Sequence, residues 1–167
     1  MDEKIIFADE NDHQIGSGPR EEAWANQIYV RIVRAILRDE NGRILSQYRS
    51  AFKKSYANCW TDSASGHVDD GESYDEAIAR EMKEEIGFET NLTFIGKFAT
   101  KDTIGDDIIC EFNAIYEGKI DNSTKLDLQE SEVSEIKWFE IDELKSLIEK
   151  DPGMFTLGFR EAIKRYY

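Results

Sequence analysis

The chain has 167 residues, enough for one domain with a substantial core, and its 40% hydrophobic and 34% charged residues are ordinary for a globular protein. It carries 35 acidic and 21 basic residues, and the formal net charge of −14 argues against a nucleic-acid binder, because such proteins need basic patches. The charge is compatible with a small phosphorylated ligand, since a bound cation can mediate that contact.

The first half of the chain predicts mostly extended structure. Ile28, Val30 and Ile32 alternate on one face, and Asn41-Gly42 is a typical hairpin turn. The expected segments are, in order, a hairpin at 4–16, a strand at 28–38, a return strand at 43–49 and an irregular stretch at 50–65. We therefore expect an N-terminal hairpin extension, covering about residues 1–20, in front of the main sheet.

A helix is predicted from about Tyr74 to Ile86. Ser73 and Glu76 have the spacing of a capping box, which satisfies free amides at a helix start. Gly87 stands where a left-handed residue commonly ends a helix. Both ends of this helix are therefore predicted from local sequence.

The last half of the chain alternates strands with helices. Strands are expected at 92–101, 108–117 and 135–139, and helices near 142–149 and 156–165. Thr156 is the predicted cap of the last helix. Strands interleaved with three helices indicate an α/β sandwich with a mixed sheet, in a single domain spanning residues 1–167.

The two cysteines and the first residues bear on the compartment. Cys59 and Cys110 are too few and too scattered for a disulfide framework or a zinc site, so we expect small buried side chains. The first residues lack the basic and apolar regions of a signal peptide, and no stretch is long enough to span a bilayer. We predict a cytoplasmic protein with neither a nucleic-acid nor a membrane partner, and a homodimer remains open.

Three glutamates lie close together on the predicted helix. At about 100° per residue, an apolar stripe faces the sheet and Glu81, Glu84 and Glu85 flank it as half-buried neighbours. The predicted stripe consists of Ile78, Ala79, Met82 and Ile86. Neighbouring carboxylates repel each other unless a cation lies among them, and oxygen ligands favour Mg²⁺ or Mn²⁺ over zinc. The alternative is a solvated acidic face balanced by Arg80 and Lys83.

The residues around this helix follow a strict spacing. They are Gly66, five residues, Glu72, seven residues, Arg80-Glu81-Met82, one residue, Glu84-Glu85, one residue, and Gly87-Phe88. This pattern resembles the complete Nudix box. The resemblance implies an α/β/α sandwich and Mg²⁺-dependent hydrolysis of a pyrophosphate bond. The implied substrate is a nucleoside diphosphate linked to another group, or a related small organic pyrophosphate.

The resemblance also implies roles for residues of the box. Glu81 and Glu85 would be the principal ligands of Mg²⁺ or Mn²⁺, assisted by Glu84 and by the carbonyl oxygen of Gly66. The general base that activates water would be Glu84, Glu85 or an acid outside the box.

Other residues have predicted supporting or binding roles. Glu72 and Arg80 would give structural support by fixing the loop before the helix. Glu132, with Glu130 beside it, is the candidate base outside the box, and its alternative is an acidic surface loop. Arg49 is a candidate phosphate contact or an exposed arginine at a strand end.

Two further residues carry paired interpretations. His67 follows Gly66 and is expected either to order the loop or to contact metal or phosphate. Trp60 is expected to be a core anchor rather than a stacking platform for a base.

The rest of the chain is similar to the subgroup related to isopentenyl-diphosphate isomerase. The segments that carry this similarity are Phe7 to Asp12, Arg20 to Ala23 and Trp60 to His67. The isomerase needs a cysteine where Ser65 stands and a histidine pair where Trp24 and Arg31 stand. We therefore expect a hydrolase, with the isomerase as the alternative. A non-catalytic ligand-sensing module is the third hypothesis, which the complete box disfavours.

Overall fold

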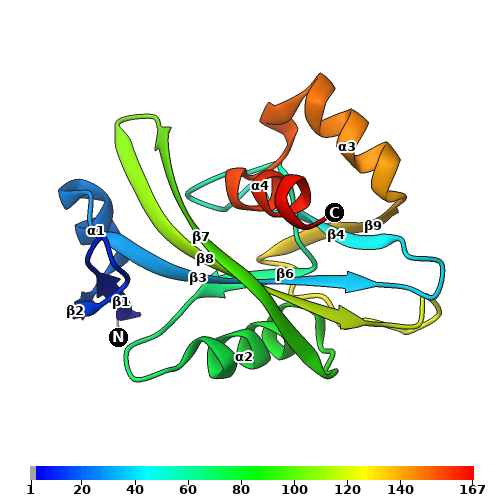
Figure 1. Cartoon of the computed structure of the whole chain (residues 1–167), viewed down its shortest axis with the longest axis horizontal. Helices are drawn as coiled ribbons and strands as arrows, with labels where there is room; N and C mark the ends of the chain where they lie inside the picture. The colour runs from blue at the N-terminus through cyan, green and yellow to red at the C-terminus, as the bar shows by residue number, and fades with distance from the viewer. Residues whose placement is uncertain (1–2) are drawn as a thin grey trace.

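A mixed sheet lies between helices in the computed structural model, which describes residues 3–167 (Figure 1). Helix α2 (Tyr74–Ile86) covers one face, and α3 (Ile141–Lys150) and α4 (Leu157–Tyr166) cover the other. The predicted α/β/α sandwich is therefore confirmed. None of the helices between residues 3 and 167 is long and apolar enough to cross a bilayer.

Within residues 3–167, nine strands build the sheet around its central strand, β3. They are β1 (Ile5–Ala8), β2 (Gln14–Gly18), β3 (Tyr29–Arg38), β4 (Ile44–Arg49), β5 (Trp60–Thr61), β6 (Ala64–His67), β7 (Leu92–Ile104), β8 (Asp107–Lys119) and β9 (Val133–Phe139). Strand β3 pairs in parallel with β8 and antiparallel with β1, β4 and β6. Strand β7 pairs with β8, and β9 pairs with β4. The N-terminal hairpin β1–β2 joins the sheet through β3.

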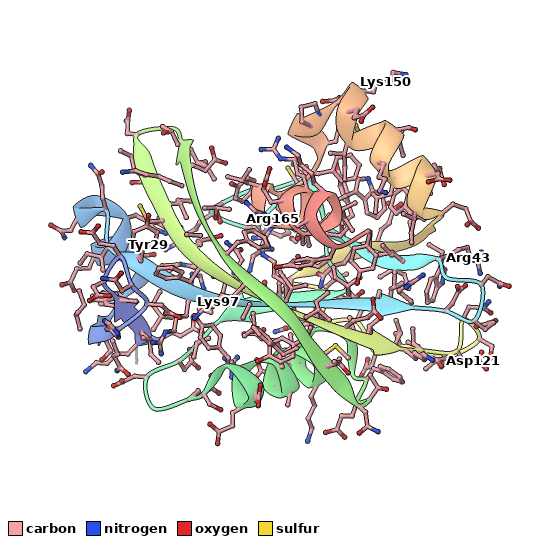
Figure 2. The ribbon with its side chains drawn as sticks, in the orientation of Figure 1. Tyr29, Arg43, Lys97, Asp121, Lys150 and Arg165 are labelled. Carbon is pink, nitrogen blue, oxygen red and sulfur yellow. The ribbon has the colours of Figure 1, made fainter. Side chains whose placement is uncertain are left out.

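Side chains fill the space between the layers (Figure 2). Tyr29, labelled in Figure 2, starts β3 and packs on Phe112 of the parallel strand β8, with ring centroids 4.8 Å apart. One core cluster lies between the sheet and α2, and a second lies under α3 and α4. Trp60 is 8% exposed and packs in the second cluster against Phe139, as predicted for a core anchor. Both cysteines are buried and unbonded.

Some local predictions were wrong. The stretch 50–65 contains β5 and the first half of β6, and these two strands are too short to leave a periodic pattern. Helix α1 (Arg20–Asn26) was not predicted. Thr156 stands at the start of α4, but its side chain makes no capping bond and lies 2.9 Å from the hydroxyl of Thr61.

Helix α2 has the predicted ends, because its capping signals are local. The Ser73 hydroxyl accepts a bond from the Glu76 amide, and the Glu76 carboxylate accepts one from the Ser73 amide, while Gly87 adopts φ 62°. The buried face differs from the predicted one, since Ala77 is buried and Ala79 is exposed. This shift places two of the glutamates inside the buried face rather than at its edge.

Candidate active site

Two carboxylates of α2 are buried against the sheet. Glu81 is 8% exposed and Glu85 is 5% exposed. The Glu85 carboxylate accepts hydrogen bonds from the side-chain amide of Gln47 (2.7 Å) and the backbone amide of Ser65 (2.9 Å). Burial raises the pKa of Glu85 to about 7, and burial together with the charge of Glu85 raises the pKa of Glu81 to about 8. The charged forms of these two carboxyl groups are therefore disfavoured, because the surrounding protein does not fully compensate for their burial.

Gly66 lies directly against the Glu81 carboxylate. A Cβ atom at residue 66 would lie 2.0 Å from Oε1 and 2.1 Å from Cδ of Glu81. A side chain would therefore displace the carboxylate, which explains the glycine by close approach rather than by a positive φ angle. The backbone of strand β6 and the buried face of α2 meet at this point.

Arg80 links the loop before α2 to the helix. Its guanidinium donates two bonds to the Glu72 carboxylate, at 2.7 and 2.9 Å, and one to the carbonyl of His67 at 3.0 Å. A further bond of 2.7 Å reaches Oε1 of Glu81. Bonding to Arg80 lowers the pKa of Glu72. These contacts join the loop to one of the buried carboxylates, and a supporting role for Glu72 and Arg80 stays a prediction.

Glu84 does not share the buried position of the other two glutamates. Its side chain is 52% exposed and accepts a bond of 3.3 Å from Arg80, one helical turn earlier. The prediction of three half-buried neighbours is therefore wrong for Glu84, since residue 84 lies outside the buried face. No group of three or more His, Cys, Asp or Glu side chains between residues 3 and 167 has the arrangement of a metal site.

The donor set at Glu81 and Glu85 nevertheless fits a hard divalent cation. Both groups are carboxylates, the ligand type that Mg²⁺ and Mn²⁺ prefer. Their raised pKa values show that buried negative charge is disfavoured there, and a cation would remove that penalty.

A cavity of about 70 Å³ lies beside these residues. Four cationic side chains line it, together with the carboxylate of Glu111: Arg20, Arg34, Arg49 and Lys53. His67 also lines it, but burial, reinforced by the neighbouring positive charges, lowers its pKa to about 3 and keeps it neutral. Gly66 and Ser65 connect the cavity to the carboxylates of α2. The cavity is thus strongly cationic within an acidic protein.

Arg49 and Glu132, both predicted from sequence, lie near this cavity in different ways. The Arg49 guanidinium lines it and donates to the carbonyls of Ser55 (3.0 Å) and Tyr56 (3.2 Å). Glu132 is partly buried and pairs with Lys53, whose side chain also lines the cavity. The structure therefore places Arg49 in the lining of the cavity. Glu132 is not part of that lining, but it forms an ion pair with Lys53, which is.

Sequence reasoning missed a buried network in the cavity wall. Arg34 donates to Asn113 (2.7 Å), to Asp62 (2.9 Å) and to Glu111 (3.3 Å). Gly158 of α4 lies against this guanidinium, because a Cβ atom there would be 2.3 Å from its nitrogens. A charged residue within the apolar alternation of 28–38 was the available signal, but its partners come from distant segments.

The residues at the isomerase-like positions make structural contacts. Arg31 donates to the carboxylate and the carbonyl of Asp12, each at 2.7 Å. Trp24 is a buried residue of α1, and the His13 side chain is 77% exposed. These contacts account for Arg31 without a histidine-based metal site.

Comparisons with known proteins show which family the chain resembles. The NUDIX domain family model matches residues 28–157. Isopentenyl-diphosphate Delta-isomerase 2 of Photorhabdus laumondii is 30% identical over 164 residues, covering 98% of this chain and 92% of that protein. The prenyl-diphosphate phosphatase of Methanosarcina mazei is 32% identical over 168 residues, covering 98% and 94%.

The solved structure of DR0079 from Deinococcus radiodurans is also similar. It superposes with a TM-score of 0.82 at 25% identity and covers 99% of both chains. Since the family model spans most of the sheet and the whole carboxylate helix, the chain belongs to the NUDIX domain family.

Proposed function

We propose that the protein hydrolyses the pyrophosphate bond of a small organic diphosphate with the help of Mg²⁺ or Mn²⁺. The observation that carries this proposal is the cationic cavity placed directly against two buried carboxylates. A diphosphate needs cations around its oxygens, and a divalent ion needs carboxylates. Gly66 lies between the cationic cavity and the buried carboxylates. It lines the cavity and lies directly against the Glu81 carboxylate.

The residues of the chain have distinct proposed roles. Glu81 and Glu85 would hold the cation, assisted by Glu84 and the Gly66 carbonyl. When bound, the cation would neutralise phosphate charge and make water a better nucleophile. Arg49 and the other cavity cations would bind and orient the phosphate oxygens.

Hydrolysis also requires a proton acceptor. Water forms a bond to phosphorus while the P–O–P bridge breaks, and a carboxylate takes the proton that water releases. Glu84 is the exposed carboxylate of the box, with no donor other than Arg80 on its side chain in the described residues. We propose Glu84 or Glu85 for this role ahead of Glu132, because Lys53 pairs with Glu132.

The substrate class extends from the expected nucleoside diphosphate derivatives to prenyl diphosphates. The phosphatase from Methanosarcina mazei supports the second group, since its name describes a prenyl diphosphate as substrate. Both groups carry the same diphosphate, which is what the cationic cavity recognises in this proposal.

Isomerisation of isopentenyl diphosphate is the second candidate, favoured by the names of several relatives. Ser65 weighs against it, because a serine hydroxyl has a far higher pKa than a cysteine thiol and exchanges protons with carbon poorly. The backbone amide of Ser65 instead donates a hydrogen bond to the Glu85 carboxylate.

Product analysis with Mg²⁺ tests the proposal. Purified protein is incubated with nucleoside diphosphates, nucleotide sugars, prenyl diphosphates and isopentenyl diphosphate, beside Glu85→Gln protein. Release of phosphate or nucleotide by wild type, lost in Glu85→Gln, is the expected result. Conversion of isopentenyl diphosphate to its isomer would establish the second candidate. Binding of a diphosphate without any turnover would instead favour a non-catalytic ligand-sensing module.

A further inference from the structure

Arg34 is the most buried of the cationic side chains that line the cavity. Its exposed fraction is 5%, whereas the other three cations of the lining are only partly buried. Two carboxylates offset its charge, because Nη1 donates to Asp62 (2.9 Å) and Nη2 donates to Glu111 (3.3 Å). Arg34 therefore adds little net positive charge to the cavity, and what it contributes depends on where its N–H groups point.

Two N–H groups of Arg34 remain for a ligand. A guanidinium carries five N–H groups in one plane. Three of them are used, since Nε donates to Asn113 in addition to the bonds from the two terminal nitrogens. One N–H group on Nη1 and one on Nη2 have no acceptor in the part of the chain that the structure describes. Neighbouring donors of this kind bind two oxygens of one phosphate.

The size of the cavity agrees with a single phosphate group. A water molecule needs about 10–15 Å³ of such space, so a cavity of about 70 Å³ holds about five water-sized atoms. A phosphate group consists of one phosphorus and four oxygens. The cavity therefore has room for one phosphate of a diphosphate and not for both.

Gly158 restricts where the guanidinium of Arg34 can lie. It is a buried residue in the first turn of α4, two residues after Thr156, which lines the cavity. A Cβ atom at residue 158 would lie 2.3 Å from Nε and from Nη2 of Arg34. Since unstrained contacts lie at about 3.5–4.0 Å, any side chain at this position would push the guanidinium aside by about 1 Å.

Asn113 of β8 fixes the same guanidinium from the sheet. Its side chain is fully buried, and its Oδ1 accepts the bond from Nε of Arg34 at 2.7 Å. Its Nδ2 donates to the hydroxyl of Thr100 on β7 at 2.9 Å, which turns the amide oxygen toward Arg34. Two separate elements, β8 and α4, therefore determine the position of one cationic group in the cavity wall.

We infer that Gly158 and Asn113 are positioning residues that fix Arg34 as a two-donor ligand for one phosphate of the substrate. The inference rests on the diphosphate-binding part of the proposed function and concerns the orientation of the phosphate. Neither Gly158 nor Asn113 lines the cavity, so each acts through the guanidinium. A shift of about 1 Å would misalign both free donors, and oriented groups lose much of their effect over such a distance.

Isothermal titration calorimetry with methylenediphosphonate and Mg²⁺ tests the inference. This diphosphate analogue has no hydrolysable bridge, so it reports binding independently of turnover. Gly158→Ala should weaken binding about tenfold or more. Gly153→Ala is the matched control, because an added Cβ there meets only Asp151 at 3.5 Å, and its Kd should stay within about twofold of wild type. Asn113→Leu removes the acceptor of Nε and should cause a similar loss, which keeps the inference testable should Gly158→Ala fail to fold.

A double-mutant cycle separates positioning from general damage to the site. Arg34→Lys keeps the charge but removes the planar group that Gly158 contacts, and it should weaken binding about tenfold. Adding Gly158→Ala to Arg34→Lys should then cost less than about twofold, because the group on which residue 158 acts is absent.

The outcomes distinguish this inference from the proposed hydrolysis. A loss in Gly158→Ala that disappears in the Arg34→Lys background supports the inference. An unchanged Kd in folded Gly158→Ala or Asn113→Leu overturns it, as does the same loss from Gly158→Ala in both backgrounds. Wild type that does not bind methylenediphosphonate also overturns it. Wild type that binds this analogue, shows the coupling and releases no product from any diphosphate contradicts the proposed hydrolysis alone.

Discussion

Replacing Glu85 with glutamine should stabilise the fold near neutral and alkaline pH while removing activity. Burial, the largest effect, raises the pKa of Glu85 from 4.5 to about 7 in spite of the bonds from Gln47 and Ser65. Because the folded pKa is the higher one, the contribution of this group to stability is complete below about pH 4.5 and is lost as the pH rises through about 7. A shift of this size corresponds to about 3 kcal/mol. Glutamine keeps an oxygen acceptor for the two donors and carries no charge.

Urea unfolding at about pH 5 and about pH 8 measures this effect. The free energy of unfolding of Glu85→Gln should exceed that of wild type by up to about 3 kcal/mol at the higher pH, and the two should converge at the lower pH. Adding Mg²⁺ at the higher pH should stabilise wild type and leave the variant unchanged. Glu84→Gln is the control, since that side chain is 52% exposed and should change stability by less than about 1 kcal/mol. A variant less stable than wild type at about pH 8 would refute the reasoning.

Two further substitutions test the packing of the site. Gly66→Ala should displace the Glu81 carboxylate, lower the free energy of unfolding by about 1–3 kcal/mol and abolish turnover, as measured by urea unfolding and phosphate release. Gly16→Ala is the control, because an added Cβ there meets nothing within 4 Å, and it should change neither the free energy of unfolding nor the turnover. A Gly66→Ala protein with unchanged stability and turnover would contradict the close approach of Gly66 to Glu81. Arg80→Lys should lower stability by about 1–3 kcal/mol in thermal unfolding, because an ammonium cannot replace the paired bonds to Glu72. An unchanged melting temperature would show that this pair contributes little.

Local signals explain the parts of the fold that could be predicted. Helix α2 was predicted to the residue because Ser73, Glu76 and Gly87 determine its ends through contacts within a few residues. The long strands β3 and β8 were predicted because they alternate or run apolar over many residues. Helix α1 and the two short strands after the loop have too few residues for such a pattern, and their structure depends on pairing with distant strands.

The residues of the site likewise fall into those that a local motif predicts and those that depend on distant segments. The motif located Glu81, Glu85 and Gly66, because its spacing lies within one loop and one helix. It could not show that Glu84 is exposed, since the burial of each helix face depends on how the helix packs on the sheet. Of the cationic side chains that line the cavity, Arg49 was predicted and the others were missed, because the lining comes from α1, β3, the end of β4 and the loop after it, β6, β8 and the start of α4.

The cationic cavity is compatible with a net charge of −14 because carboxylates hold several of its basic side chains. Asp62 pairs with Arg34, and Glu132 pairs with Lys53. Arg49 differs, since its guanidinium bonds to carbonyl oxygens and takes part in none of the ion pairs formed within residues 3–167. Burial lowers the pKa of Arg49, and the charge of Glu85 opposes that shift without a direct bond. The fold therefore holds a partly buried guanidinium and a buried carboxyl group without an ion pair between them, and a diphosphate carrying a divalent ion would compensate both together.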